Sequence, residues 1–192
     1  NRGVPLIYSG VLFDNERKTF GIPDLIIRSD WLNKLVESPA IDSKESKISA
    51  PNLVNPVTEK PPRYHYRIVD IKFSTLHLKA DGIHLLNSGS IPAYKSQLEI
   101  YTRALGKIQG YDSGVAYILG RKWNYTSKGD KLGGTNALDR YGVIDFNGID
   151  SEYSSRTDKA IEWIRECRRD GSNWRESIEN ANETTILHPN LY

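Results

Sequence analysis

The chain has 192 residues, of which 38% are hydrophobic and 26% are charged, a balance that suits one globular domain with a substantial core. Its formal net charge of +2 permits nucleic-acid binding without demanding it, because a basic groove and an acidic centre cancel in the total. A single cysteine excludes an internal disulfide and fits a reducing compartment. No run of about 18 apolar residues is present, so we expect no membrane association and an intracellular, cytoplasmic protein.

The N-terminal part of the chain predicts a hairpin followed by a short helix. Two strands are expected over Pro5 to Phe13 and Thr19 to Ile27, joined by a polar turn. A helical piece follows over Trp31 to Val36. The chain begins at Asn1 and contains no methionine, so we expect a fragment of a longer protein from which a preceding helix has been removed.

A change of composition marks residues 37–63, which are rich in Ser, Pro, Lys and Asn. The prolines exclude a regular element, and we expect a surface insertion between two strands, where long loops cost little. A loose connector is the favoured interpretation. A flap that grips DNA is the alternative, since Lys44, Lys47 and Lys60 lie in this segment.

The remaining elements alternate between strands and helices. A helix is expected to open near Ser90 and to end before Gly110, and both residue types suit those positions. The full order predicts an α/β fold, an α/β/α sandwich around a central mixed β-sheet. The expected elements after residue 63 are a strand over 64–73, a helix over 90–108, strands over 113–119 and 141–146, and a helix over 152–170.

The apolar strand over 64–73 contains the triplet Asp70, Ile71 and Lys72. Side chains alternate on a strand, so Asp70 and Lys72 point the same way. Such a pair on a buried strand is costly to desolvate, and a site for a divalent metal explains it better than packing does. Asp24, one strand earlier, supplies a second carboxylate. Because Mg²⁺ prefers few carboxylates together with waters and phosphate oxygens, the pattern predicts phosphodiester hydrolysis.

Three elements carry a family resemblance, and they are Pro23-Asp24, the triplet Asp70-Ile71-Lys72, and the helical pair Gln97 and Tyr101. Together they resemble the PD-(D/E)XK nuclease superfamily and its RecB-type branch, which includes the small CRISPR-associated nucleases that process DNA for spacer capture. The resemblance implies a restriction-endonuclease-like core and a single nuclease domain over residues 1–192. The chain looks most like the cluster-free version in the CRISPR-like virophage-resistance system of giant viruses, which implies a virus-encoded protein acting in the infected cell.

The resemblance also implies the metal ligands. Carried over to this chain, Asp24, Asp70 and the carbonyl of Ile71 would bind Mg²⁺ or Mn²⁺. Many CRISPR-associated relatives hold an iron–sulfur cluster with four cysteines, whereas this chain has only Cys167 and is expected to hold none. An additional upstream acidic or histidine ligand of the family has no clear counterpart before Asp24.

The resemblance also implies roles for three residues that do not bind the metal. Lys72 would orient or activate the attacking water. Gln97 and Tyr101 lie four residues apart and share one helical face, so they would hold the helix against the active centre or contact DNA.

Basic and aromatic side chains predict further DNA contacts. An ordinary solvated hairpin is an equally good interpretation of the segment from Arg121 to Gly134. The candidate DNA-binding residues are Lys95, Arg121, Lys122, Trp123 and Tyr125.

The favoured function is therefore a Mg²⁺- or Mn²⁺-dependent deoxyribonuclease, an exonuclease acting in DNA processing, recombination or antiviral defence. Its expected partners are DNA, a second copy of the chain, or a helicase-type protein. The alternative is a catalytically weak nucleic-acid-binding accessory module with the same fold. A phosphatase is disfavoured because no small-substrate motif is evident.

Overall fold

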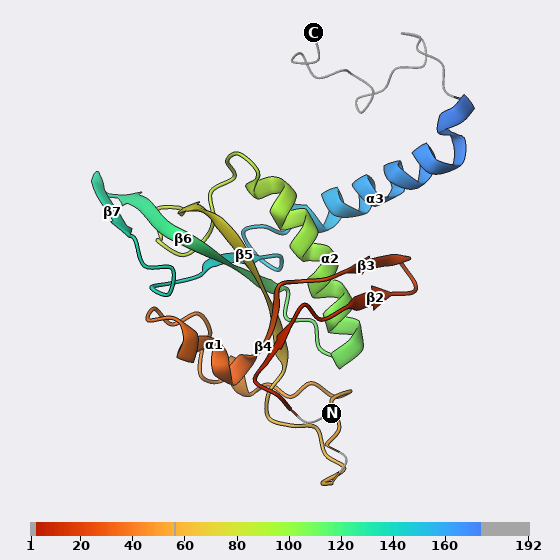
Figure 1. The fold of residues 1–192 in the computed structure, drawn as a ribbon, viewed down its shortest axis with the longest axis horizontal. Coiled ribbons are helices and arrows are strands. Elements are labelled where there is room, and N and C mark those ends of the chain that lie inside the picture. The colour runs from red at the N-terminus through yellow and green to blue at the C-terminus, as the bar shows by residue number, and fades with distance from the viewer. Residues whose placement is uncertain (1–2, 56, 174–192) are drawn as a thin grey trace. The chain divides into compact units, whose positions relative to one another are not determined.

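A mixed β-sheet forms the centre of the fold in the computed structural model, which describes residues 3–55 and 57–173 (Figure 1). Its strand order is β1-β4-β5-β6-β7, and β8 pairs with β6 beside this path. The pair β5 and β6 is parallel, whereas the other pairs in the sheet are antiparallel. The strands are β1 (Leu6–Tyr8), β2 (Leu12–Asp14), β3 (Thr19–Gly21), β4 (Leu25–Arg28), β5 (Tyr66–His77), β6 (Val115–Ser127), β7 (Asp130–Gly134) and β8 (Gly142–Asp145).

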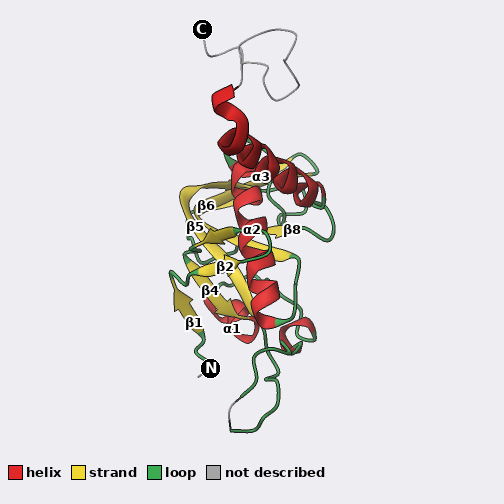
Figure 2. Cartoon of the chain, turned by 90° about the vertical axis from the view of Figure 1, so that its right-hand side faces the viewer, coloured by secondary structure: helices red, strands yellow, loops and turns green. Residues whose placement is uncertain are grey.

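Helices cover both faces of this sheet. The α-helices are α1 (Ser29–Leu35), α2 (Ile91–Gln109) and α3 (Glu152–Asp170). Helix α2 packs over β5 and contributes Leu98 and Leu105 to the larger apolar core, while α1 contributes Leu32 to a second core on the other face. Figures 1 and 2 show α1 and α2 on opposite sides of the strands. A mixed α/β fold with a mixed central sheet is thus confirmed.

The chain separates into two compact units, Asn1–Thr157 and Asp158–Tyr192. The first unit holds every strand of the described residues, together with α1 and α2. In the second unit the described residues form the rest of α3 and a 3-10 turn over Gly171–Asn173. None of the helices in the described ranges is both long and apolar enough to cross a membrane.

Strand β5 lies between β4 and β6, and its side chains alternate between the two cores. Tyr66 and Ile68 join the core beneath α2, whereas Val69 joins the core beneath α1. A strand buried on both faces reads as a nearly continuous apolar run, as this one does in the sequence. The alternation places Asp70 and Lys72 on the side of the sheet that faces α2.

The predicted N-terminal hairpin is present, but each of its strands is broken in two. Strands β1 and β4 pair within the main sheet, whereas β2 and β3 form a separate two-stranded sheet. At the break, Ser9 has a left-handed backbone with φ +49°, and its amide donates to the carbonyl of Asp24 at 2.9 Å. The detached hairpin packs on α2, where Lys107 Nζ lies 2.9 Å from Asp14 Oδ1. The chain therefore re-enters the main sheet directly after Asp24.

Helix α2 begins and ends close to the expected positions. Gly110, which caps the C-terminus of α2, adopts φ +73° and donates its amide to the carbonyl of Gly106. Glycine adopts this left-handed conformation without the steric penalty that a side chain would bring.

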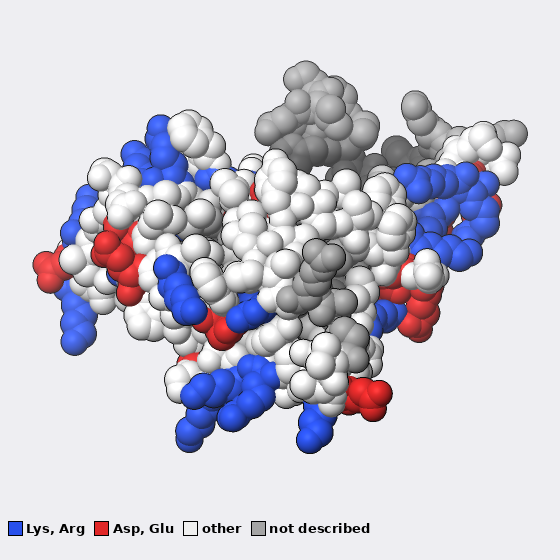
Figure 3. All heavy atoms as spheres, turned by 60° about the horizontal axis from the view of Figure 1, so that its bottom comes forward, with Lys and Arg blue, Asp and Glu red and all other residues white. Residues whose placement is uncertain are grey.

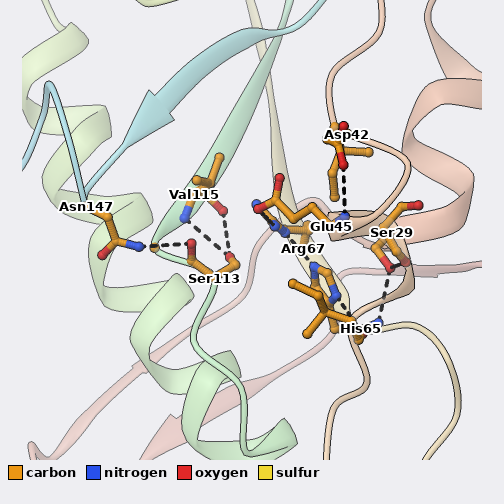
Figure 4. Close-up of polar contacts among 12 residues, drawn as sticks. Ser29, Asp42, Glu45, His65, Arg67, Ser113, Val115 and Asn147 are labelled. Atoms are coloured by element: carbon orange, nitrogen blue, oxygen red, sulfur yellow. Dashed lines mark hydrogen bonds and ion pairs between the residues drawn. The ribbon is translucent and has the colours of Figure 1, made fainter.

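A buried polar cluster fastens the insertion 37–63 to the sheet (Figure 4). Arg67 on β5 is 1% exposed, and it donates from Nε to His65 Nε2 at 2.8 Å and from Nη2 to Glu45 at 2.5 Å. The Ser29 hydroxyl donates to a backbone carbonyl of the insertion at 2.6 Å. The insertion is held at its middle by these contacts, so a wholly loose connector is wrong for that part of it.

The His65 ring is neutral in this cluster. Its Nε2 accepts from Arg67, so the proton lies on Nδ1, which faces the carbonyl of Ile48 at 3.1 Å. Burial, with the Arg67 guanidinium adding to it, lowers the pKa of His65 from 6.5 to about 4.

We expect this histidine to make stability fall in mild acid. Its pKa in the fold lies below that of the unfolded chain, so the unfolded state gains a proton first and stability decreases from about pH 6.5 to about pH 4. The full effect is on the order of 3 kcal/mol. Urea unfolding of the wild type and of His65→Gln, which does not titrate, should show curves that approach each other as the pH falls. Parallel curves would contradict a neutral buried His65.

Candidate active site

Two carboxylates lie close together just before β4 begins beside β5. In the antiparallel pair, Leu25 lies opposite Val69, so the residues one step further, Asp24 and Asp70, also lie opposite each other. Residues opposite in such strands have Cβ atoms roughly 5 Å apart. Asp24 directly precedes β4 and Asp70 lies on β5, so the two carboxylates come from neighbouring segments of the sheet.

Asp24 also binds the backbone of β5. Its Oδ2 accepts a hydrogen bond from the amide of Ile71 at 2.7 Å. The side chain thus replaces the backbone carbonyl that β4 would supply if the strand pairing continued. One carboxylate oxygen of Asp24 remains for another partner.

Asp70 is 3% exposed, and its Oδ2 lies 2.5 Å from Lys72 Nζ. Burial raises the pKa of Asp70, and the neighbouring Asp24 carboxylate raises it further, while Lys72 acts in the opposite direction. Two ionised carboxylates are therefore costly at this place, because burial removes the water that would solvate their charge. A divalent cation would relieve this cost directly.

Lys72 is held from two sides. Besides its contact with Asp70, its Nζ lies 4.6 Å from the centroid of the Tyr94 ring on α2. The negative face of an aromatic ring attracts an ammonium group, which restricts the lysine to one place. Tyr94 was not among the candidate residues, although it shares a helical face with Gln97 and Tyr101, and that spacing is the signal that could have identified it.

The residues present fit a hard divalent cation. Asp70 Oδ2 is buried and receives no hydrogen bond of good geometry, so it is a ligand atom without a directed donor. Asp24, Asp70 and the Ile71 carbonyl are oxygen donors of the kind that Mg²⁺ and Mn²⁺ prefer. Within residues 3–55 and 57–173, no group of three or more His, Cys, Asp or Glu side chains forms a metal-binding cluster. Two carboxylates and one carbonyl are a donor set of the few-carboxylate kind that Mg²⁺ accepts.

Gln97 and Tyr101 form a hydrogen-bonded pair on α2, in which Gln97 Nε2 donates to the Tyr101 hydroxyl at 2.7 Å. The Tyr101 ring is 8% exposed and packs directly on the backbone of Gly21, where a Cβ would lie 1.9 Å from its Cε1 atom. Gly21 precedes Asp24 by three residues. Tyr101 therefore supports the segment that carries Asp24, and only glycine allows so close an approach.

Lys95 does not lie on the surface. It is completely buried, and Nζ contacts Asp150 Oδ1 at 2.6 Å, Asn87 Oδ1 at 2.7 Å and the Leu85 carbonyl at 3.1 Å. Burial lowers the pKa of Lys95, while Asp150 acts in the opposite direction. All three donors of the ammonium are used inside the protein, so this structure offers no DNA contact at Lys95.

The aromatic residues of the β6–β7 hairpin are used in packing. The rings of Trp123 and Tyr125 stack with centroids 5.9 Å apart, and the Arg140 guanidinium lies 4.0 Å from the Trp123 centroid. Trp123 Nε1 donates to Asp139 at 2.8 Å. These partners leave little open ring surface for a base.

The basic residues of the same hairpin are more accessible, since Arg121 is exposed and Lys122 is half-buried. On the face drawn in Figure 3, lysine and arginine side chains occur in separate groups with acidic side chains among them. No single continuous basic stripe crosses that face, in keeping with the small net charge.

Comparison with known proteins identifies no family for this chain. No protein-family model matches the chain, and no curated protein matches it either.

We expect Asp70→Asn to separate folding from metal binding. Because burial raises the pKa of Asp70, the neutral amide should leave the melting temperature in chelator unchanged or higher. A divalent ion at 100 times its Kd should stabilise the wild type by about 2.7 kcal/mol, and the variant should lose this gain. Thermal melts with EDTA and with Mn²⁺ measure both effects. Equal Mn²⁺ stabilisation of the variant and the wild type would contradict the site.

Variants of the Tyr101 ring test its support of Asp24. Tyr101→Ala opens a cavity beside Gly21, so we expect a loss of about 3 kcal/mol in stability together with weaker Mn²⁺ binding. Gln97→Ala is the matched control, since it removes the hydrogen bond and leaves the ring in place, and its Mn²⁺ affinity should stay near that of the wild type. Isothermal titration with Mn²⁺ decides, and unchanged affinity in Tyr101→Ala would show that the ring does not position Asp24.

Proposed function

We propose that this chain is a metal-dependent deoxyribonuclease of the PD-(D/E)XK type, which hydrolyses phosphodiester bonds and acts as an exonuclease. The observation that carries the proposal is the arrangement of Asp24 and Asp70 opposite each other, with Lys72 ion-paired to Asp70. Around them lies a mixed α/β fold with a mixed central sheet, a fold class compatible with this proposal.

In this proposal the carboxylates of Asp24 and Asp70 and the carbonyl of Ile71 hold Mg²⁺ or Mn²⁺. A bound ion supplies a Lewis acid and lowers the pKa of a coordinated water. The protein itself fixes the two carboxylates, excludes bulk water from Asp70 and brings an ammonium group to the same place. Lys72 then orients the attacking water or stabilises charge on the phosphate.

Lys72 is well placed for such a role because its partners restrict it. Asp70 and the Tyr94 ring hold the ammonium, and 21% of its side chain is exposed, so a substrate phosphate can approach it. A lysine that served only packing would have no need of this access. We assign Gln97 and Tyr101 to positioning rather than to metal binding.

The proposed substrate is DNA, processed in recombination or defence, with a second copy of the chain or a helicase-type protein as further partner. The alternative is an accessory module with the same fold that binds nucleic acid but does not cleave it. An assay with plasmid and end-labelled DNA in Mg²⁺, Mn²⁺ or chelator distinguishes them. Metal-dependent cleavage supports the nuclease, whereas binding without cleavage supports the accessory module.

We expect Lys72→Ala to reduce the single-turnover cleavage rate by roughly 100-fold or more, with little change in DNA affinity. Its ammonium acts on the reacting groups, while most of the affinity comes from other basic side chains. Lys72→Arg should not restore the rate, because a planar guanidinium cannot replace a compact ammonium in so confined a place. The measurement is cleavage at saturating enzyme, beside binding in Ca²⁺. A variant that binds weakly but cleaves normally once bound would make Lys72 a docking residue.

A further inference from the structure

Phe73 follows Lys72 on β5, and its side chain is 86% exposed. Ile71, two residues earlier and on the same side of the strand, is 47% exposed. Asp70 and Lys72 point toward α2, so the Phe73 ring follows the candidate site along β5 but projects from the opposite face of the sheet, the face of Val69. Exposed apolar surface of this kind often marks a binding site. The sequence pattern could not reveal this, because the ring continues an apolar strand.

A β-bulge lies at Phe73. Lys72 lies opposite Gly120 and Thr75 opposite Lys122, so two residues of β5, Phe73 and Ser74, face only Arg121 of β6. Bulges are rare between parallel strands, and they occur next to active sites, where they redirect a side chain. The irregularity therefore begins directly after the candidate catalytic lysine.

Arg121 completes the arrangement. Its guanidinium carbon lies 5.0 Å from the centroid of the Phe73 ring, and the residue itself is exposed. The pair thus combines an open aromatic surface with a cation at its edge. Nucleic acids offer the matching chemistry, because each nucleotide joins a flat base to a phosphate.

The sheet leaves this part of β5 uncovered on one side. The pairing of β4 with β5 ends at Val69, and from Lys72 to Leu76 the strand that pairs with β5 in the described residues is β6. Phe73 lies on this stretch, four residues beyond the last pair. The open edge of β5 connects the face that carries Asp70 and Lys72 with the face that carries Phe73, so a DNA strand held at the candidate site would reach Phe73 by passing around this edge.

We propose that Phe73 and Arg121 form a nucleotide contact beside the active site, in which an unpaired base stacks on Phe73 and Arg121 binds the adjoining phosphate. The proposal rests on the function proposed above and extends it to how the DNA strand is placed. Base–aromatic stacking accounts for roughly 5- to 100-fold in affinity per base. This contact would require an unpaired base, because a base within a duplex has no free face.

The test compares variants of the pair in DNA binding. Fluorescence anisotropy in Ca²⁺ measures the affinity for a short labelled oligothymidylate and for a blunt duplex of the same length. Phe73→Leu should weaken single-strand binding by roughly 5- to 100-fold and leave duplex binding unchanged, whereas Phe73→Trp should retain the affinity. Phe13→Leu is the matched control, since Phe13 is another exposed phenylalanine, 59% exposed on β2. It should bind as the wild type does.

Two further measurements separate the roles of base and phosphate. An abasic oligonucleotide should bind the wild type as weakly as Phe73→Leu binds the normal one, and Phe73→Leu should not respond to the loss of the bases. Arg121→Gln should reduce the slope of log affinity against log salt by about 0.7, the value for one phosphate contact in a single strand. Phe73→Leu should leave that slope unchanged.

The outcomes distinguish the stacking contact at Phe73 from the nuclease function on which it rests. If the wild type cleaves DNA and Phe73→Leu binds both DNAs as the wild type does, the stacking contact is wrong and the nuclease proposal stands. If Phe73→Leu changes only self-association in sedimentation, the ring contacts a second copy of the chain, and the stacking contact is again wrong. If the wild type neither binds nor cleaves DNA, both proposals fail.

Discussion

The hydrogen bond between the Ile71 amide and the Asp24 carboxylate holds the candidate site together. It forms directly beyond the last backbone pair of β4 and β5, so the Asp24 side chain accepts the hydrogen bond in place of a backbone carbonyl. It ties the segment before β4 directly to the strand that carries Asp70, in addition to the hydrogen bond from the Ser9 amide to the Asp24 carbonyl. The broken hairpin, the glycine at position 21 and the ring of Tyr101 all act on this same segment.

The site concentrates charge in a place that solvates it poorly. Two carboxylates and an ammonium lie together, and Asp70 is almost completely buried. Packing alone would favour apolar residues of the same volume, because a buried ion pair seldom repays its desolvation. The neighbouring Lys95–Asp150 pair has the same chemistry but is fully enclosed, with every donor of the ammonium satisfied. Of these two pairs, the one at Asp70 and Lys72 keeps access to solvent, since 21% of the Lys72 side chain is exposed.

Sequence patterns predicted what depends on near neighbours. The alternation of β5 placed Asp70 and Lys72 on one side, and the glycine at position 110 marked the end of α2. The same patterns did not predict contacts between residues that lie far apart in the sequence. The sequence predicts Lys95 as a DNA-binding residue, because its buried partner Asp150 lies 55 residues further along the chain. The bulge at Phe73 depends on the register between β5 and β6, which no local pattern encodes.

The Asp24 carboxylate has two tasks, since one oxygen binds the Ile71 amide and the other is free for a cation. If the proposed cation binds there, strand closure and cation binding are linked equilibria, and each changes the other by the same free energy. The Ile71 amide proton reports on both. Its exchange with solvent deuterium reveals how often the strand end opens, and slower exchange upon titration with an ion would measure the coupling at a single backbone position.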